Sequence, residues 1–109
     1  MRVRVWTTPQ ADQQAIAATD WWRANRPSSP DLFARELSGA VGLLADAPDI
    51  GRPYRDSSAS GLRRLLLPIT RYHVYYVHDA ENGAVVVLAI WSAVRGRVPV
   101  LAPQPKGKT

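Results

Sequence analysis

The chain has 109 residues and no cysteine, which fits one small domain and excludes disulfides and thiolate chemistry. Its 14 basic residues against 9 acidic ones give a net charge of +5, which favours an acidic partner, either nucleic acid or an acidic protein segment. With two histidines, no acidic cluster beside them and no glycine-rich phosphate loop, we expect neither a metal site nor a cofactor.

The sequence contains no candidate for a membrane-spanning segment. No apolar run approaches the roughly 20 residues that a helix needs to cross a bilayer. The start, Met1–Trp6, alternates polar and apolar residues and lacks the long apolar core of a signal peptide. We therefore expect a soluble, cytoplasmic protein with no membrane partner.

The first predicted elements are a strand and a helix. Arg2–Trp6 alternates arginine with valine, which predicts a half-buried strand. Thr8 and Pro9 then form a helix start, because threonine can cap free amides and proline at the first helical position loses no needed donor. The helix is predicted to end near Asn25. Residues at helical spacing give it one inner face: Ala11, Ala15, Ala18 and Trp22.

A second helix is predicted from Pro30, with Ser29 as its cap, to the stop at Ala47-Pro48-Asp49. Its inner face has the same spacing: Phe33, Leu37, Ala40 and Leu44. Two amphipathic helices joined by a short linker form an antiparallel hairpin, which must pack on another layer to be stable. Residues 50–60 are rich in turn formers and are predicted to be loop.

Three strands are predicted between Gly61 and Ser92. Leu62–Leu67 is apolar apart from Arg63 and Arg64, Tyr72–Val77 is almost wholly aromatic or β-branched, and Val85–Trp91 carries no charge. Turns at Pro68-Ile69-Thr70 and at Asn82-Gly83 separate the three runs. The short links require antiparallel pairing. The predicted fold is therefore α+β, in the order β-α-α-β-β-β, with an antiparallel sheet packed against the helical hairpin. It occupies residues 1–98 as a single domain, followed by an extended proline-rich tail at 99–109.

Both faces of the last two strands are apolar, so neither is an ordinary solvated face. On the first of these strands, alternation places Tyr72, Val74 and Tyr76 on one side and His73, Tyr75 and Val77 on the other. On the second, it places Val85, Val87, Ala89 and Trp91 against Val86, Leu88, Ile90 and Ser92. The face with Tyr72 and Val74 is expected to meet the helices. The opposite face, here called the second face, has two interpretations: it binds a partner, or loops and the tail cover it.

The order of elements and several short sequence motifs resemble the ParE/RelE superfamily of bacterial type II toxins, and ParE most closely. The resemblance covers about residues 2–97. The matching motifs are Trp21-Trp22, Asn25-Arg26-Pro27, Gly51-Arg52-Pro53, Gly61-Leu62-Arg63-Arg64, Arg71-Tyr72-His73-Val74-Tyr75-Tyr76 and Val87-Leu88-Ala89-Ile90-Trp91, the last of which leads to Arg95-Gly96-Arg97.

The resemblance implies a toxin that a cognate antitoxin neutralises, and that contacts operator DNA only through the antitoxin complex. ParE members act on DNA gyrase, whereas RelE members cut messenger RNA on the ribosome. RNA cleavage needs cations and a proton acceptor. Arg64 and Arg95 are candidate cations, but His73 stands where an arginine is expected, Leu66 interrupts the basic face, and no tyrosine or histidine follows His78.

We therefore assign no catalytic residue and expect gyrase inhibition by binding. The alternatives are a RelE-like mRNA endoribonuclease and an inactive relative that only binds antitoxin to regulate its operon. The candidate partner-binding residues, for antitoxin or target, are Arg63, Arg64, Arg71, His73, Tyr75, Trp91, Arg95 and Arg97. One of Arg63 and Arg64 is expected to be structural. Trp91 is expected either to contact the antitoxin or to belong to the core. Tyr75 is expected to contribute more antitoxin affinity than Arg97.

Overall fold

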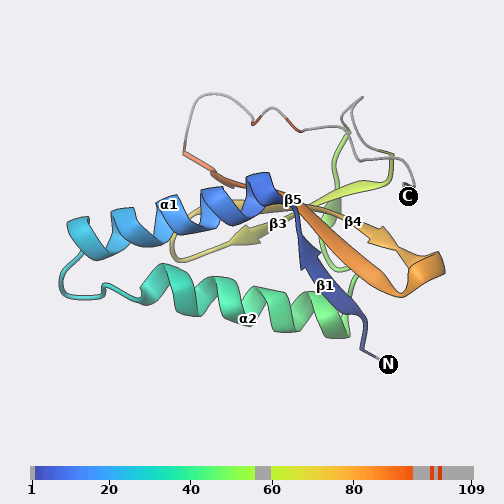
Figure 1. The fold of residues 1–109 in the computed structure, drawn as a ribbon, viewed down its shortest axis with the longest axis horizontal. Coiled ribbons are helices and arrows are strands. Elements are labelled where there is room, and N and C mark those ends of the chain that lie inside the picture. Colours follow the sequence, from blue (N-terminus) through green and yellow to red (C-terminus); the bar gives the residue numbers. More distant parts are fainter. Residues whose placement is uncertain (1, 56–59, 95–98, 100, 102–109) are drawn as a thin grey trace.

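Two helices cover one face of a five-stranded sheet (Figure 1). The computed structural model describes residues 2–55, 60–94, 99 and 101. Its elements are β1 (Arg4–Thr7), α1 (Pro9–Asn25), α2 (Leu32–Asp46), β2 (Arg52–Pro53), β3 (Leu62–Leu67), β4 (Tyr72–Asp79), a 3₁₀ turn η1 (Ala80–Asn82) and β5 (Ala84–Ser92). Across the sheet the strands follow the order β1-β5-β4-β3-β2. The predicted α+β class and the helical hairpin on the sheet are confirmed.

The start of α1 is as predicted, whereas α2 starts later. Thr8 Oγ1 accepts a hydrogen bond from the Ala11 amide at 3.1 Å, and the hydroxyl donates to the Leu88 carbonyl at 3.2 Å. The cap therefore also ties α1 to β5. The prediction of Pro30 as first residue of α2, with Ser29 as its cap, is wrong, because residues 27–31 form turns and a bend and the helix begins at Leu32. Its N-cap, Asp31, makes no capping hydrogen bond and pairs instead with Arg23.

The core lies between the helices and one face of the sheet. Phe33 and Leu44 of α2 are fully buried there together with Val74 of β4 and Val87 of β5. Burial of such side chains from water is the main term holding the layers together. Three residues expected to be largely buried pack against this core but are only partly buried: Trp22, Leu37 and Tyr72.

The sheet differs from the prediction at both edges. β1 pairs in parallel with β5, so the sheet is mixed and not wholly antiparallel. The predicted loop 50–60 also contains the two-residue strand β2, which pairs antiparallel with β3 through Arg52 and Arg64. The turn between β4 and β5 is a 3₁₀ turn closed by Gly83, whose φ of 59° is the left-handed conformation that glycine adopts at little cost.

A bulge in β5 reverses the predicted faces of the end of that strand. Tyr75 pairs with Ala89 but Tyr76 pairs with Val87, so Leu88 is an extra residue. Beyond the bulge, Ile90 packs in the helix-side core. Ala89 and Trp91 pack instead in a second cluster, on the opposite face. The expected grouping of Ala89 and Trp91 with Val85, and of Ile90 with Val86 and Leu88, is therefore wrong.

The side chain of Gln14 on α1 contacts β5 close to this bulge. Its Oε1 accepts a hydrogen bond from the Ile90 amide at 2.8 Å, and Ile90 directly follows the irregular part of β5. A backbone donor that is shielded from water needs such a partner. Gln14 and the Thr8 cap therefore fix α1 over β5. Within the described part of the chain, no helix is long and apolar enough to cross a membrane.

Candidate functional site

Aromatic side chains and one arginine form the centre of the second face. Tyr54 follows β2, and its ring meets that of Tyr75 on β4 at a centroid distance of 5.3 Å. The guanidinium carbon of Arg64 lies 4.7 Å from the Tyr54 ring centroid and 6.0 Å from that of Tyr75. Stacking over two rings holds this cation in one place. The structure thus brings together Arg64 and Tyr75, as predicted, and adds Tyr54.

The chain itself covers part of the second face. Tyr75 is only 2% exposed, and it packs in a cluster with Leu62, Leu88, Ala89 and Leu101. Leu101 lies in the segment predicted to be an extended tail, and most of that segment falls outside the described residues. Of the two interpretations of this face, covering by a loop and the tail is therefore observed around Tyr75. A partner reaches this ring only where these covering residues move.

His73 sits on the same face as Arg64, and its imidazole is poorly suited to carry charge. Its ring lies 6.0 Å from the Tyr75 ring, edge to face. Burial lowers the pKa of His73 below its ordinary value, and the positive charges of Arg64 and Arg71 lower it further. His73 is therefore neutral at physiological pH. In that form it can accept a proton but adds no cation to the face.

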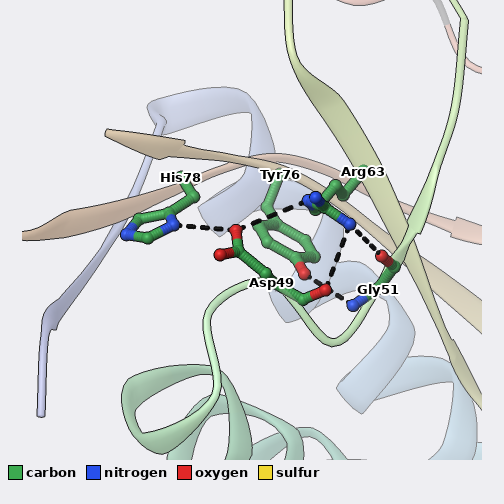
Figure 2. Close-up of polar contacts among 5 residues, drawn as sticks. All are labelled: Asp49, Gly51, Arg63, Tyr76 and His78. Atoms are coloured by element: carbon green, nitrogen blue, oxygen red, sulfur yellow. Dashed lines mark hydrogen bonds and ion pairs between the residues drawn. The ribbon is translucent and has the colours of Figure 1, made fainter. Parts of the chain in front are cut away.

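Arg63 points to the helix side of the sheet and has a structural role (Figure 2). Its Nη1 donates to the carbonyl oxygens of Gly51, at 2.7 Å, and of Asp49, at 3.1 Å. The hydroxyl of Tyr76 accepts the Gly51 amide at 2.8 Å, and His78 Nδ1 lies 2.8 Å from Asp49 Oδ1. These contacts fix the chain between α2 and β2. Arg63 is thus the structural member of the arginine pair, while Arg64 reaches the second face.

Arg71 and Trp91 lie at one end of the sheet. Arg71 is in the turn between β3 and β4, and its carbonyl accepts the Ala93 amide at 2.7 Å. Trp91 on β5 is the register partner of His73. Both residues line a cleft beside α1, although Trp91 also packs in the cluster of Tyr75 on the second face. Arg64 is not among the described residues that line the cleft. The predicted set therefore divides into separate groups. Arg95 and Arg97 fall outside the described residues.

Comparison with known proteins decides the family. The family model for the ParE toxin of type II toxin-antitoxin systems, parDE, matches residues 5–96. The chain belongs to this family. A search of curated proteins finds no match.

Solved structures of related systems share the toxin's fold. The chromosomal ParDE system from P. aeruginosa gives a TM-score of 0.69 at 17% identity, covering 84% of this chain and 96% of that one. The RelBE toxin-antitoxin complex from Mycobacterium tuberculosis gives 0.62 at 22% identity, covering 84% and 99%. The intact E. coli RelBE complex gives 0.57 at 15% identity, covering 85% and 99%. At these identities the similarity shows the fold alone.

The sequence left two members of the toxin's second face unassigned. Tyr54 lies in a stretch of turn formers, and the composition of that stretch does not indicate that Tyr54 stacks on Arg64. Leu101 lies among prolines, far along the chain from the strands that it contacts. A large apolar residue inside an otherwise polar or proline-rich stretch was the available signal. Among the described residues, no group of acidic and histidine side chains is arranged to hold a metal ion.

Proposed function

We propose that this ParE-family toxin inhibits DNA gyrase by binding to it, without catalysing a reaction, and that a cognate antitoxin neutralises it. Membership of the family supports the toxin role, and two solved structures that share its fold are toxin-antitoxin complexes. Gyrase is the target that the resemblance to ParE implies. Action by binding is supported by the second face, whose central side chains pack on one another and are not open to a substrate.

The observation that carries this proposal is that Arg64 and Tyr75 on the second face already contact other side chains of the toxin. RNA cleavage needs cations open to a phosphate and a group that takes the proton of the ribose hydroxyl. Arg64 is stacked between Tyr54 and Tyr75, and Tyr75 is buried. Leu66, exposed on β3, interrupts the basic face. An RNA strand would thus meet a largely closed and partly apolar surface among the described residues.

A RelE-like mRNA endoribonuclease is the second candidate, and His73 is the observation that favours it. Burial, together with the charges of Arg64 and Arg71, lowers the pKa of His73, so its imidazole is neutral and free to take up a proton. In that mechanism His73 would take the ribose 2′-hydroxyl proton and an arginine would steady the phosphate. Replacing His73 with glutamine, which keeps a polar side chain but cannot accept that proton, would then abolish cleavage.

Expression of the toxin without antitoxin separates the candidates. Gyrase inhibition predicts filamentous cells and a DNA-damage response, with messenger RNA levels maintained over the first minutes. The His73→Gln variant should arrest cells as the wild type does. Rapid loss of messenger RNA that depends on His73 or Arg64 would establish the ribosome-dependent candidate instead. Cells that show neither effect would indicate an inactive relative that only binds antitoxin.

A further inference from the structure

A cleft of about 630 Å³ opens between the second half of α1 and one end of the sheet. Trp21, Trp22 and Arg26 line it from the helix, Ile69 and Arg71 from the β3–β4 turn, and Ile90 from β5. We call it the α1 cleft. It lies at the helix layer, whereas Arg64 and Tyr75 lie on the second face of the sheet.

Large apolar side chains are exposed around the α1 cleft. Ile69 is 63% exposed and Trp21 is 46% exposed. A single exposed apolar residue is ordinary, but several that border one concave surface are typical of an interaction site. Aromatic residues in particular are common where protein partners make their strongest contacts. The cleft therefore has the apolar part of a docking surface.

The charge of the α1 cleft is positive. The guanidinium carbon of Arg26 lies 5.3 Å from the Trp21 ring centroid and 5.6 Å from the Trp22 ring centroid. The two rings therefore position this cation at the rim of the cleft. Arg71, in the β3–β4 turn, is the second basic residue that lines the cleft. None of the described residues that line the cleft is acidic. The complementary ligand thus carries carboxylates next to an apolar side chain.

The β3–β4 turn is held rigidly in the position that shapes the cleft. Glu36 on α2 accepts hydrogen bonds from the Ile69 amide at 2.7 Å, the Thr70 amide at 2.9 Å and the Thr70 hydroxyl at 2.6 Å. The next residue, Arg71, has a φ of 64°, which is unfavourable for a residue with a side chain. Such a conformation persists only where its surroundings impose it, and it is common at binding sites. The cleft is therefore formed before a partner arrives.

We propose that the α1 cleft is where the toxin grips its target protein, by taking an acidic segment that carries an apolar anchor. The anchor packs against Ile69 and Trp21, and the carboxylates meet Arg26 and Arg71. A preformed cleft suits a folded partner, because neither side has to become ordered on binding. An antitoxin that folds on binding instead suits the extended second face. The aliphatic lining, with Ile69 and Ile90, favours protein over nucleic acid. Only the identity of the target as gyrase rests on the proposed function.

Two matched substitutions test the cleft. Ile69→Asp places a negative charge in it, and Ile16→Asp makes the same change on α1 at a residue that does not line it. Their side chains are equally open, at 63% and 61% exposed, so both variants should fold. Ile69→Asp should raise the toxin concentration for half-inhibition of gyrase by at least about tenfold, since loss of a hot-spot contact has that size. Ile16→Asp should stay within about twofold of the wild type.

Arg71→Gly separates the charge from folding. Glycine removes the guanidinium and accepts the positive φ, so the melting temperature should not fall. Inhibition should still weaken by about tenfold if Arg71 meets a carboxylate. Both cleft variants, Ile69→Asp and Arg71→Gly, should bind the antitoxin as the wild type does. Their expression without antitoxin should also arrest growth less than that of Ile16→Asp, a readout that holds for any target.

Other outcomes overturn one proposal or the other. The cleft proposal fails if Ile69→Asp inhibits its target like the wild type. It also fails if the variants lose antitoxin affinity alone, or lose only the binding of a single-stranded DNA oligonucleotide. A wild type that arrests growth but leaves gyrase active overturns the gyrase proposal, and growth arrest by the variants then decides the cleft. A wild type that does neither overturns both.

Discussion

At the scale of single residues, the contact between Gly51 and Tyr76 fixes the entry into β2. The Gly51 amide donates to the Tyr76 hydroxyl at 2.8 Å, in a place where the ring is fully buried. A Cβ on Gly51 would lie 2.7 Å from that oxygen and 3.1 Å from the Arg64 carbonyl oxygen. Glycine is needed here for close approach of the chain to a side chain.

Gly51→Ala should therefore lower the free energy of unfolding by about 2 kcal/mol, the usual cost of overpacking a buried site. Gly39→Ala is the matched control, because its Cβ would meet nothing within 4 Å and it lies inside α2. That change should raise stability by about 0.5–1 kcal/mol through helix propensity. Urea unfolding measures both. Equal effects from the two substitutions would contradict the packing described around Gly51.

The carboxylate of Glu36 makes the stability depend on pH. Its burial raises the pKa, but hydrogen bonds from the Thr70 hydroxyl and from the Ile69 and Thr70 amides lower it more, so the pKa lies below the ordinary value of 4.5. A carboxyl with a lowered folded pKa contributes stability that is fully present above its unfolded pKa. That contribution is lost as the pH falls through the folded pKa.

Glu36→Gln should accordingly destabilise the toxin near neutral pH, by about 1–2 kcal/mol for weakened hydrogen bonds to a charged group. The difference between variant and wild type should shrink below pH 4.5, where the wild-type carboxyl takes up a proton. Urea unfolding at several pH values measures it. A difference that stayed constant down to about pH 3 would show that the charge of Glu36 does not hold the β3–β4 turn.

At the scale of elements, an aromatic contact contributes to the packing of α2 on the sheet. Phe33 is 0% exposed, and its ring centroid lies 4.8 Å from that of Tyr72 on β4. Phe33→Ala should cost about 3–5 kcal/mol of stability, as large core truncations do. Leu43→Ala, an exposed position on the same helix, should cost less than about 1 kcal/mol. Similar costs for the two would mean that the ring of Phe33 is not part of the core.

The elements could be predicted where the sequence has a clear period, and not where it has none. The face of α2 followed from the spacing of Phe33 and Leu44. Val85–Ile90 is apolar throughout, so a bulge at Leu88 changes which side chains face the helices without changing the pattern. Gln14, which accepts the Ile90 amide, is 76 residues away along the chain and has no local signature. The parallel pairing of β1 with β5 likewise joins segments that are far apart along the chain, so it has no local signature either.

The candidate site was predictable to a similar degree. Arg63 and Arg64 are neighbours on a strand, so one was bound to face the helices, but the sequence does not say which. That choice depends on the Asp49 and Gly51 carbonyl groups, which the chain brings to Arg63 only after folding. The covering of Tyr75 depends likewise on Leu101, which comes from a distant segment.

At the scale of the whole molecule, the account predicts how antitoxin binding responds to salt. We expect the antitoxin to bury apolar groups on the second face, which supplies most of the affinity, while arginines such as Arg64 speed the encounter. Raising the salt concentration should then slow association clearly and weaken affinity only modestly. Surface-immobilised antitoxin at two salt concentrations measures both rates. Loss of binding at high salt would show that the interface is mainly electrostatic.

The central claim is that the toxin acts on gyrase by binding and not by cutting RNA. Its most direct test adds purified toxin to purified gyrase and supercoiled plasmid, with ribosomes translating a defined messenger RNA in a parallel reaction. The account predicts loss of supercoiling activity, relieved by antitoxin, with the messenger RNA intact. Intact supercoiling activity with messenger RNA cut on the ribosome would contradict it.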